Sequence, residues 1–540
     1  MRLSIILTLA ASILSAQVDE ITGQRIRAHV KFLSSDLLEG RGPGTRGGDL
    51  AAEYIASQFG LLGLKPGGDN GTFFQRVPLI GAEPQSSAAL SAEVNGRKID
   101  FKWMDEFTGV TRDQKELSAF DAEAVFVGHG ITAPEFNWDD YKGIDVAGKV
   151  VVLFTNEPPS EDPRFFKGKA LTYYGRWTYK YEQALAKGAV ACLIIHTSPT
   201  AGYGWQVVQG FGREDSQVEL DRGQKGLSFA GWLNKKSSEQ IAATLGKSVD
   251  ELLKMADTPG FKAIPLGVRF KGSIPMKIRR MDTRNVVAWI EGADPKGKSE
   301  AVIYSAHWDH LGIGPAVNGD TIYNGAVDNA TGCAMLIEMA RAWSTLPRKP
   351  RRSAVFTAVT AEEAGLRGAD YQAAHPLFPV GKTAANLNFD SFFPFGRTKD
   401  IGLNGAERTT LWPTVQEITR RFQLAIAPDP HPEQGHYYRS DHFTFAKAGI
   451  PAFSISGGNQ VLGKPDDFGD QVFYEYNAKH YHQPSDQYKD DWDFGGMEQM
   501  ARFGYTLGLT IANQAVMPTW NAGDEFLPAR KRSFAAVNVQ

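Results

Sequence analysis

Histidine, aspartate and glutamate side chains collect at the ends of apolar runs in the second half of the chain. The runs AVIYSA, AVFTAVTA and ANLNF lead respectively into His307 and Asp309, into Glu362 and Glu363, and into Asp390. These residue types, with no cysteine among them, suit Zn²⁺ or a similar divalent cation bound through nitrogen and oxygen. The pattern therefore indicates a divalent metal site.

Two further segments can complete such a site. Asp328 stands in the loop YNGAVDNATG before a helical run, and His482 follows Tyr481 in a short aromatic and polar stretch. Hydrolysis of an unactivated amide needs a nucleophile at neutral pH, and a metal ion lowers the pKa of water from 15.7 to about 7. Two ions about 3.5–4 Å apart can share one water and need a bridging carboxylate.

The neighbouring glutamates can divide two other tasks. A carboxylate that does not bind metal must take the proton of the attacking water. Glu362 and Glu363 can face the base position and the metal respectively, and Asp309 suits a carboxylate that orients the imidazole of His307. Taken singly, an acidic pair also suits the start of a helix, and Asp328 suits a helix cap. Only the joint pattern indicates catalysis.

The segments around these residues predict the scaffold that positions them. From about residue 284 onward, apolar strand-like runs alternate with amphipathic helical runs, which is the pattern of a layered α/β sheet. In open α/β sheets, sites form beyond the carboxyl ends of the strands. We therefore expect these polar segments, which are far apart in the sequence, to converge at one edge of a sheet.

Five motifs resemble, in this order, those of the M28 family of co-catalytic zinc peptidases: SAHWDH, GAVDNATG, TAEEAGLRGA, NFDS and YHQPSD. The resemblance covers about residues 276–515 and the N-terminal stretch DLLEGRGPGTRGGDLAAEYIASQF. A middle segment with GHGI, WDDYKGIDVAGKVVVL and EQALAKGAVACLII looks like the protease-associated (PA) domain often inserted in this family. The resemblance implies an α/β fold with a mixed twisted sheet flanked by helices, the zinc-dependent exopeptidase fold, and an inserted β-rich PA domain.

The resemblance also implies a role for each site residue. The implied zinc ligands are His307 and Asp390 for one ion, Glu363 and His482 for the other, and Asp328 as the bridge. The implied catalytic residues are Glu362 as general acid/base, Asp309 as the residue that orients His307, and Tyr481, which matches a tyrosine that stabilises the tetrahedral intermediate in some members. Two Zn²⁺ per chain are thus expected, and other divalent metals such as Co²⁺ or Mn²⁺ can compete for such sites.

The expected function is that of an exported zinc aminopeptidase that removes N-terminal residues from peptides. A carboxypeptidase or dipeptidase on the same pair of metals is the nearest alternative. A glutaminyl-cyclase-like activity, which uses one zinc, fits less well because this chain has the ligand residues for both zinc ions. A peptide-binding protein with a structural metal site is the alternative from another class. Structural zinc sites are closed by protein ligands and need no base, so the presence of Glu362 favours the enzyme.

Three other patterns suggest chemistry that their context does not support. Gly292–Ser299 satisfies G-x-x-x-x-G-K-S, but strand-like runs precede and follow it, so we interpret it as the turn of a β-hairpin and not as a phosphate site. Ser440, Asp441 and His442 are the residue types of a serine triad, yet sequence neighbours rarely have the required geometry. We interpret His310 as a neighbour of the metal site and not as a ligand.

Composition limits the partners. The 540 residues include 58 Lys and Arg against 61 Asp and Glu, a net charge of -3 without a long basic run. This balance disfavours nonspecific binding to nucleic acid or to an anionic membrane. Peptide substrates are the partners that the resemblance to M28 peptidases implies. The two cysteines, Cys192 and Cys333, lie far apart in apolar segments, which excludes a disulfide scaffold and a cysteine-based zinc finger.

The chain is expected to divide into five parts. MRLSIILTLAASILSA pairs one arginine with a short apolar run that ends in small residues, as in a secretory signal peptide, and is shorter than the roughly 20 residues of a membrane span. The mature protein is therefore expected in a periplasm or outside the cell, without a membrane span. The parts are the signal peptide 1–16, an N-terminal part of the peptidase domain 17–115, the inserted PA domain 116–275, the catalytic domain 276–520 and a basic, loosely packed tail 521–540.

Overall fold

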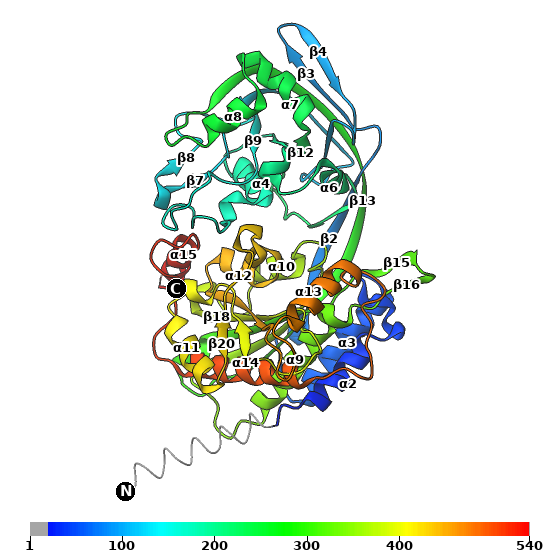
Figure 1. Ribbon diagram of the computed structural model, residues 1–540, viewed down its shortest axis with the longest axis vertical. Coiled ribbons are helices and arrows are strands. Elements are labelled where there is room, and N and C mark those ends of the chain that lie inside the picture. Colours follow the sequence, from blue (N-terminus) through cyan, green and yellow to red (C-terminus); the bar gives the residue numbers. More distant parts are fainter. Residues whose placement is uncertain (1–19, 539–540) are drawn as a thin grey trace. The chain divides into compact units, whose positions relative to one another are not determined.

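The computed structural model describes residues 20–538, which form two compact units (Figure 1). Among the described residues, the first unit comprises 20–77, 282–430 and 437–538, and the second comprises 78–281 and 431–436. The expected signal peptide, residues 1–16, lies outside the described residues.

A mixed sheet forms the centre of the first unit. Its strands lie in the order β13-β17-β14-β18-β21-β19-β20, and β17, β14, β18 and β21 run parallel to one another. The main strands are β13 (Ile264–Ile290, whose last part belongs to this unit), β14 (Ala301–His307), β17 (Ser353–Val359), β18 (Thr383–Phe389), β19 (Asp400–Gly402), β20 (Ala425–Ala427) and β21 (Ala452–Gly457). Shorter additions are β1 (Lys65–Pro66), the first part of β2 (Phe74–Pro84) and the separate hairpin of β15 (Gly312–Val317) and β16 (Asp320–Tyr323).

Helices cover both faces of this sheet, so its central strands are buried throughout. Every residue of β14, β17 and β18 is buried, as their near-continuous apolar sequences predict for parallel strands covered on both sides. Helices α9 and α14 pack on one face and α12, with α10 beside it, on the other (Figure 1). The expected α/β class, a mixed sheet flanked by helices, is confirmed.

The helices of the first unit are of ordinary globular length. They are α2 (Gly23–Leu33), α3 (Arg46–Leu61), α9 (Thr331–Ser344), α10 (Arg367–Ala374), α11 (Trp412–Arg421), α12 (His442–Ala448), α13 (Phe468–Lys479), α14 (Gly495–Asn513) and α15 (Leu527–Asn538). Between residues 20 and 538, no helix has the length and apolar character needed to cross a membrane.

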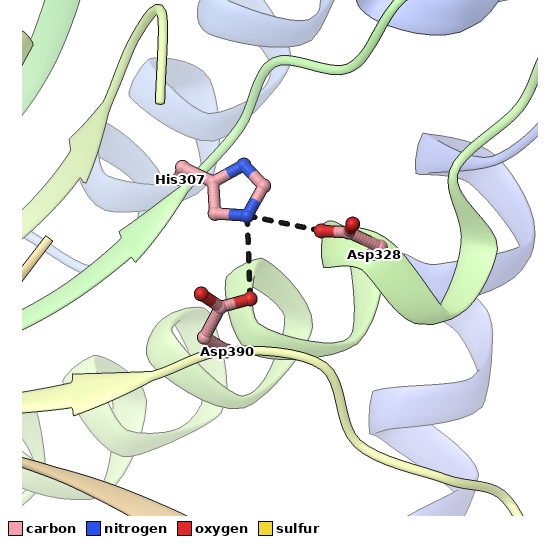
Figure 2. A group of neighbouring side chains, drawn as sticks. All are labelled: His307, Asp328 and Asp390. Carbon is pink, nitrogen blue, oxygen red and sulfur yellow. Dashed lines mark hydrogen bonds and ion pairs between the residues drawn. The ribbon is translucent and has the colours of Figure 1, made fainter. Parts of the chain in front are cut away.

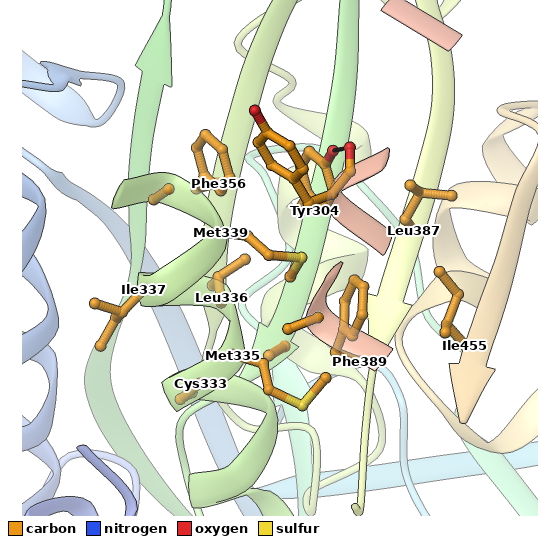
Figure 3. Packing of buried hydrophobic residues seen from close by; sticks show 14 of the residues in the cluster. Tyr304, Cys333, Met335, Leu336, Ile337, Met339, Phe356, Leu387, Phe389 and Ile455 are labelled. Carbon is orange, nitrogen blue, oxygen red and sulfur yellow. Dashed lines mark hydrogen bonds between the residues drawn. The ribbon is translucent and has the colours of Figure 1, made fainter. Parts of the chain in front are cut away.

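The core of the first unit fixes the strands that carry the polar clusters. Leu336 and Met339 of α9 lie among the buried side chains of β14, β17 and β18, including Tyr304 and Phe356 (Figure 3). The rings of Tyr304 and Phe356 stack with centroids 5.1 Å apart. Each fully buried side chain of this size contributes about 1.5–3 kcal/mol. Cys333 lies in the same core as a free thiol, as its apolar surroundings predict.

The second unit is a β-rich module with its own sheet and core. Its strands lie in the order β4-β3-β13-β6-β9-β10-β12-β5, with β6, β9, β10 and β12 parallel. The strands are β3 (Ala89–Val94), β4 (Arg97–Phe101), β5 (Phe107–Val110), β6 (Leu117–Phe126), β7 (Thr132–Ala133), β8 (Trp138–Asp139), β9 (Val150–Phe154), β10 (Ala191–Ile195), β11 (Asp215–Val218) and β12 (Phe229–Leu233). The helices are α4 (Trp177–Ala186), α5 (Ser198–Ala201), α6 (Trp205–Gln209), α7 (Lys235–Ala242) and α8 (Val249–Ala256). The expected insertion 116–275 lies within this unit, and its identity as a PA domain stays a prediction.

Two expectations about the first unit are wrong. The strands on either side of Gly292–Ser299 do not form a hairpin, because β17 lies between β13 and β14 and pairs with both. Turn residues end a strand in either arrangement, so they do not reveal which strand fills the adjacent position. The C-terminal tail is not loosely packed, since Arg530 of α15 is buried and donates hydrogen bonds to the carbonyls of Pro518 and Val380.

Candidate metal centre

The carboxyl ends of three neighbouring parallel strands bring the predicted ligands together. β14 ends at His307, β18 ends one residue before Asp390, and β17 ends three residues before Glu362. The register pairs Ser305 of β14 with Asn388 of β18. His307 and Asp390, each two residues further on, therefore stand at the same level, and the expected convergence at one edge of the sheet is observed.

The first group of potential ligands surrounds one imidazole nitrogen. His307 Nε2 lies 3.1 Å from Asp328 Oδ1 and 3.3 Å from Asp390 Oδ1 (Figure 2). One ligand atom from each of these three residues fits within a span of 4.8 Å. Ser440 donates a hydrogen bond of 2.5 Å to the other oxygen of Asp390 and so orients its carboxylate. The donor set matches that of a divalent cation bound by one nitrogen and two oxygens.

A second group of ligands shares Asp328 with the first. Ligand atoms of His310, Asp328 and Glu363 lie within 4.8 Å of one another, with His310 Nδ1 2.6 Å from Glu363 Oε1. His482 Nε2 lies 2.9 Å from Glu363 Oε2 and 3.5 Å from Asp328 Oδ2. The structure thus brings together the five predicted ligands, and it adds His310, which sequence reasoning placed beside the site and not in it.

The second group contains buried polar atoms that a bound metal ion would satisfy. Both ring nitrogens of His310, His482 Nε2 and Glu363 Oε1 are buried, and none of them makes a well-oriented hydrogen bond with the described residues, although His310 Nδ1 and His482 Nε2 lie within ion-pair distance of the Glu363 carboxylate. Buried polar atoms are normally paired, because leaving one unpaired costs free energy. Imidazole nitrogens and carboxylate oxygens are the ligands of Zn²⁺ sites without cysteine, so a cation placed among them satisfies these atoms.

Asp309 connects the ligand His307 to the adjacent glutamates. Its buried carboxylate accepts backbone hydrogen bonds from Glu362 at 3.1 Å and from Glu363 at 3.4 Å. His307 Nδ1 lies 3.8 Å from this carboxylate and 3.2 Å from the backbone carbonyl of Asp309. Burial raises the pKa of Asp309 to about 6. Asp309 therefore fixes the start of the glutamate segment and lies beside the nitrogen of His307 that points away from Asp328 and Asp390.

Glu362 lies next to both groups of ligands and belongs to neither. Burial raises the pKa of its carboxyl well above the usual range; His307 opposes this shift, and the carboxyls of Glu363 and Asp441 add to it. A carboxyl with a raised pKa accepts a proton more readily than an ordinary glutamate does. Ala361, directly before it, has a φ of 53°, a left-handed conformation that residues with a side chain rarely adopt.

Tyr481 stands at the exposed rim of the centre. The residue is 44% exposed, and its ring stacks on that of His482 with centroids 3.8 Å apart. Burial of its hydroxyl, reinforced by the carboxylates of Asp328 and Glu363, raises the pKa of the phenol above its usual range. The hydroxyl therefore keeps its proton and can donate it in a hydrogen bond.

Comparisons with known proteins identify what parts of this chain are similar to. Residues 285–504, which include every predicted ligand, match the model of peptidase family M28. This region is similar to peptidase family M28. The chain is 30% identical over 164 residues to a probable zinc metalloprotease of Pyricularia oryzae. This match covers 30% of this chain and 29% of that protein. It is 27% identical over 212 residues to leucine aminopeptidase 2 of Trichophyton rubrum, covering 38% and 40% of the two chains.

The chain therefore spans less than half the length of these two curated relatives. Among solved structures, an aminopeptidase from Aneurinibacillus sp. strain AM-1 aligns with a TM-score of 0.48 and 19% identity, covering 93% of this chain and 96% of that one. The resemblance to M28 peptidases inferred from the five motifs is confirmed for the matched region.

The matched region also contains a residue that holds the loop carrying Asp328 in place. The sequence analysis did not identify this residue. The carboxylate of Asp486 accepts backbone hydrogen bonds from Val327 at 3.0 Å and from Asp328 at 3.1 Å, and the hydroxyl of Tyr476 donates to it at 3.0 Å. Its signal was present, because Asp486 ends the motif YHQPSD four residues after His482. One short segment thus supplies a potential ligand and holds the backbone of another.

Proposed function

We propose that the protein is a binuclear zinc aminopeptidase that removes residues from the N-termini of peptides. The observation that carries this proposal is one carboxylate, that of Asp328, which belongs to two groups of potential metal ligands. A pair of ions bridged in this way is the arrangement of hydrolases that activate a single water between two metals. Glu362, outside both groups, is the base that such a reaction requires.

The residues divide the work as follows. Bound zinc supplies a Lewis acid that polarises a carbonyl and lowers the pKa of water to about 7. Glu362 takes the proton of the attacking water and delivers it to the amine that leaves. Tyr481 donates its phenolic hydrogen to the carbonyl oxygen as that oxygen gains negative charge. The residues that would hold the ions are His307 and Asp390 for one, Glu363 and His482 for the other, and Asp328 for both.

The similar proteins support a zinc peptidase in general terms. One is named a probable zinc metalloprotease and another a leucine aminopeptidase. Their sequences match only part of this chain, and a carboxypeptidase or dipeptidase would use the same pair of metals. The choice of an aminopeptidase among these exopeptidases is therefore decided by experiment.

The deciding experiment is product analysis by mass spectrometry on a mixed set of peptides. Each peptide is supplied free, N-acetylated and C-amidated, with the full zinc-loaded chain and with a chelated control. Stepwise loss of N-terminal residues that acetylation and the chelator both block is the expected result. Loss from the C-terminus, blocked by amidation, would make the protein a carboxypeptidase. Binding of peptides without cleavage in any set would favour the binding-protein alternative and contradict the proposal.

Export is part of the same proposal. It rests on the apolar segment MRLSIILTLAASILSA with its single arginine. Fractionation of expressing cells, followed by N-terminal sequencing of the mature protein, tests it. Intact protein that begins at Met1 in the cytoplasm would contradict export without affecting the proposed chemistry.

A further inference from the structure

The N-terminal motif DLLEGRGPGTRGG has no role in the chemistry above, yet it places a charged side chain deep in the first unit. The motif forms the short 3-10 helix η1 (Asp36–Arg41) and the start of α3. Arg41, at the end of η1, is only 1% exposed and has a φ of 52°. Burying a guanidinium is costly unless its N–H groups are paired, so its partners indicate what it does.

The Arg41 guanidinium donates four hydrogen bonds, all to backbone carbonyls. The acceptors are Trp308 (from Nε, 2.7 Å), Leu33 (from Nη1, 2.6 Å), Asn324 (from Nη1, 2.6 Å) and Gly325 (from Nη2, 2.8 Å). These carbonyls come from three segments of the chain that are far apart in sequence. Two of the segments carry the metal centre.

We propose that Arg41 is a positioning residue that sets the spacing of the two loops on which the metal centre is built. Trp308 directly follows His307, and Gly325 precedes Asp328 by three residues. A planar guanidinium offers its N–H groups in a fixed fork, so it holds carbonyls at defined separations, which a single ammonium group cannot do. The inference rests on the proposed function, since it assumes that the centre binds metal.

The loop that carries Asp328 is held from two sides. Arg41 binds its carbonyl groups at residues 324 and 325, whereas Asp486 binds its N–H groups at residues 327 and 328. The backbone carbonyl of Arg41 also accepts a hydrogen bond from the backbone N–H of His310 at 3.3 Å. Arg41 is thus connected to segments of both ligand groups.

Close packing of the backbone holds Arg41 itself in place. A Cβ atom at Gly40 would lie 2.5 Å from the carbonyl oxygens of both Gly312 and Tyr323, in the hairpin of β15 and β16. Gly40 also has a φ of 68°, which favours glycine. The glycine before Arg41 is therefore required for η1 to approach the hairpin, and the motif is explained as a support for the arginine.

The test compares Arg41→Lys and Arg41→Met with a matched control, Arg530→Lys. Arg530 is also a buried arginine of the first unit that donates to backbone carbonyls, but its acceptors are Pro518 and Val380, away from the ligand loops. Zinc affinity is measured on the full chain by competition with a chromogenic chelator, and the visible spectrum of the Co²⁺-loaded protein reports ligand geometry. Residues that orient metal ligands typically change metal affinity 10–100-fold when mutated.

The expected result is a roughly 10–100-fold weaker zinc affinity and an altered Co²⁺ spectrum in both Arg41 variants. Arg530→Lys should lower thermal stability while its zinc affinity stays within about twofold of wild type. Wild-type zinc affinity in Arg41→Lys would overturn the inference, whatever the activity. Weakened zinc binding in that variant, together with a zinc-loaded wild type that cleaves no peptide, would retain the inference and reject the proposed function.

A second variant covers the case in which neither Arg41 variant folds. The Asn324 side chain donates to the carbonyl of Ser34 at 3.0 Å and to the carboxylate of Asp36 at 2.8 Å, so it joins the same N-terminal segment to the same loop. Asn324→Ala leaves Arg41 intact and should weaken zinc binding in the same direction by a smaller factor. Unchanged zinc affinity in folded Asn324→Ala would show that the link between the N-terminal segment and the Asp328 loop does not affect the metal centre, which contradicts the inference.

Discussion

Both units place polar side chains at the carboxyl ends of parallel strands, but their surroundings differ. In the second unit, Glu157 follows β9 and His196 follows β10. Glu157 accepts hydrogen bonds from the backbone and the hydroxyl of Thr172, and His196 Nε2 lies 3.0 Å from the carbonyl of Tyr203. Each side chain is thus paired with a local backbone or hydroxyl group, which stabilises the fold.

In the first unit the corresponding side chains face one another. His307, Asp328 and Asp390 converge, as do His310, Asp328 and Glu363, and these are the two groups of potential ligands found between residues 20 and 538. Parallel strand ends alone therefore do not make a site. A metal site forms where the acidic side chains and imidazoles lie closest to one another, and not where each is paired with the backbone.

The largest expected effect comes from removing the charge that both ligand groups share. Asp328→Asn keeps the shape of the side chain but loses the carboxylate at the bridging position, so we expect little retained zinc after dialysis and no measurable hydrolysis. Metal analysis by mass spectrometry measures this. The matched change in the second unit is Asp140→Asn, which alters a buried carboxylate that accepts hydrogen bonds from the Ile131 backbone N–H and the Trp138 indole. It should leave zinc content unchanged. Full zinc content in Asp328→Asn would show that the two groups do not share this ligand.

Glu362→Gln tests whether Glu362 transfers the proton without binding the metal. Glutamine cannot accept the proton, and general-base catalysis typically contributes 10²–10⁴-fold, so we expect kcat to fall by roughly 10³-fold with zinc content unchanged. Steady-state kinetics on a peptide and metal analysis of the same sample test both parts. Glu157→Gln in the second unit is the control and should keep kcat. Near-normal turnover in Glu362→Gln would assign the proton transfer to another group.

The sequence indicated the ligands because each directly follows an apolar strand or belongs to a recognisable motif. It did not indicate Arg41, whose main-chain partner Trp308 is 267 residues away, because a hydrogen bond to a backbone carbonyl leaves no trace in the identity of the acceptor residue. The sequence also did not predict the left-handed backbone conformation at Ala361, Ser391 and His482. Glycine is the usual sequence signal for that conformation, and none of these positions is glycine.

The order of strands shows a similar limit. The apolar runs on either side of Gly292–Ser299 are strands, as expected, yet their pairing is set by β17, which lies more than fifty residues further along the chain. Local patterns predict elements, whereas pairing between non-consecutive strands depends on how the whole sheet packs. This is why the hairpin expectation was wrong although both strands were correctly expected.

His310→Asn tests whether this imidazole belongs to the centre. His310 Nδ1 lies 2.6 Å from Glu363 Oε1, so its loss should weaken zinc binding about 10-fold, either by removing a ligand or by freeing the carboxylate of Glu363. Competition with a chelator measures the affinity. His196→Asn, which also replaces a buried histidine at a strand end, should leave it unchanged. Equal zinc affinities in the two variants would return His310 to the role of a neighbour.

The smallest expected effect concerns a buried charge of the second unit. The amine of Lys180 donates to the carbonyls of Asn156 at 2.8 Å and Tyr174 at 2.6 Å, and burial lowers its pKa from 10.5 to about 7. Lys180→Met leaves these carbonyls without that donor, so we expect about 1–3 kcal/mol less stability by denaturant unfolding and no change in zinc affinity.

The lowered pKa of Lys180 also predicts how the stability difference between wild type and Lys180→Met changes with pH. Because the folded-state pKa of Lys180 lies below its unfolded value, the unfolded chain binds more protons between pH 7 and 10.5, and this group makes the wild type more stable as the pH rises through that range. The variant lacks this contribution, so the stability difference between the two proteins should widen from pH 7 to pH 10. A constant difference, or a loss of zinc affinity in Lys180→Met, would contradict the separation between charges that stabilise the second unit and charges that build the metal centre.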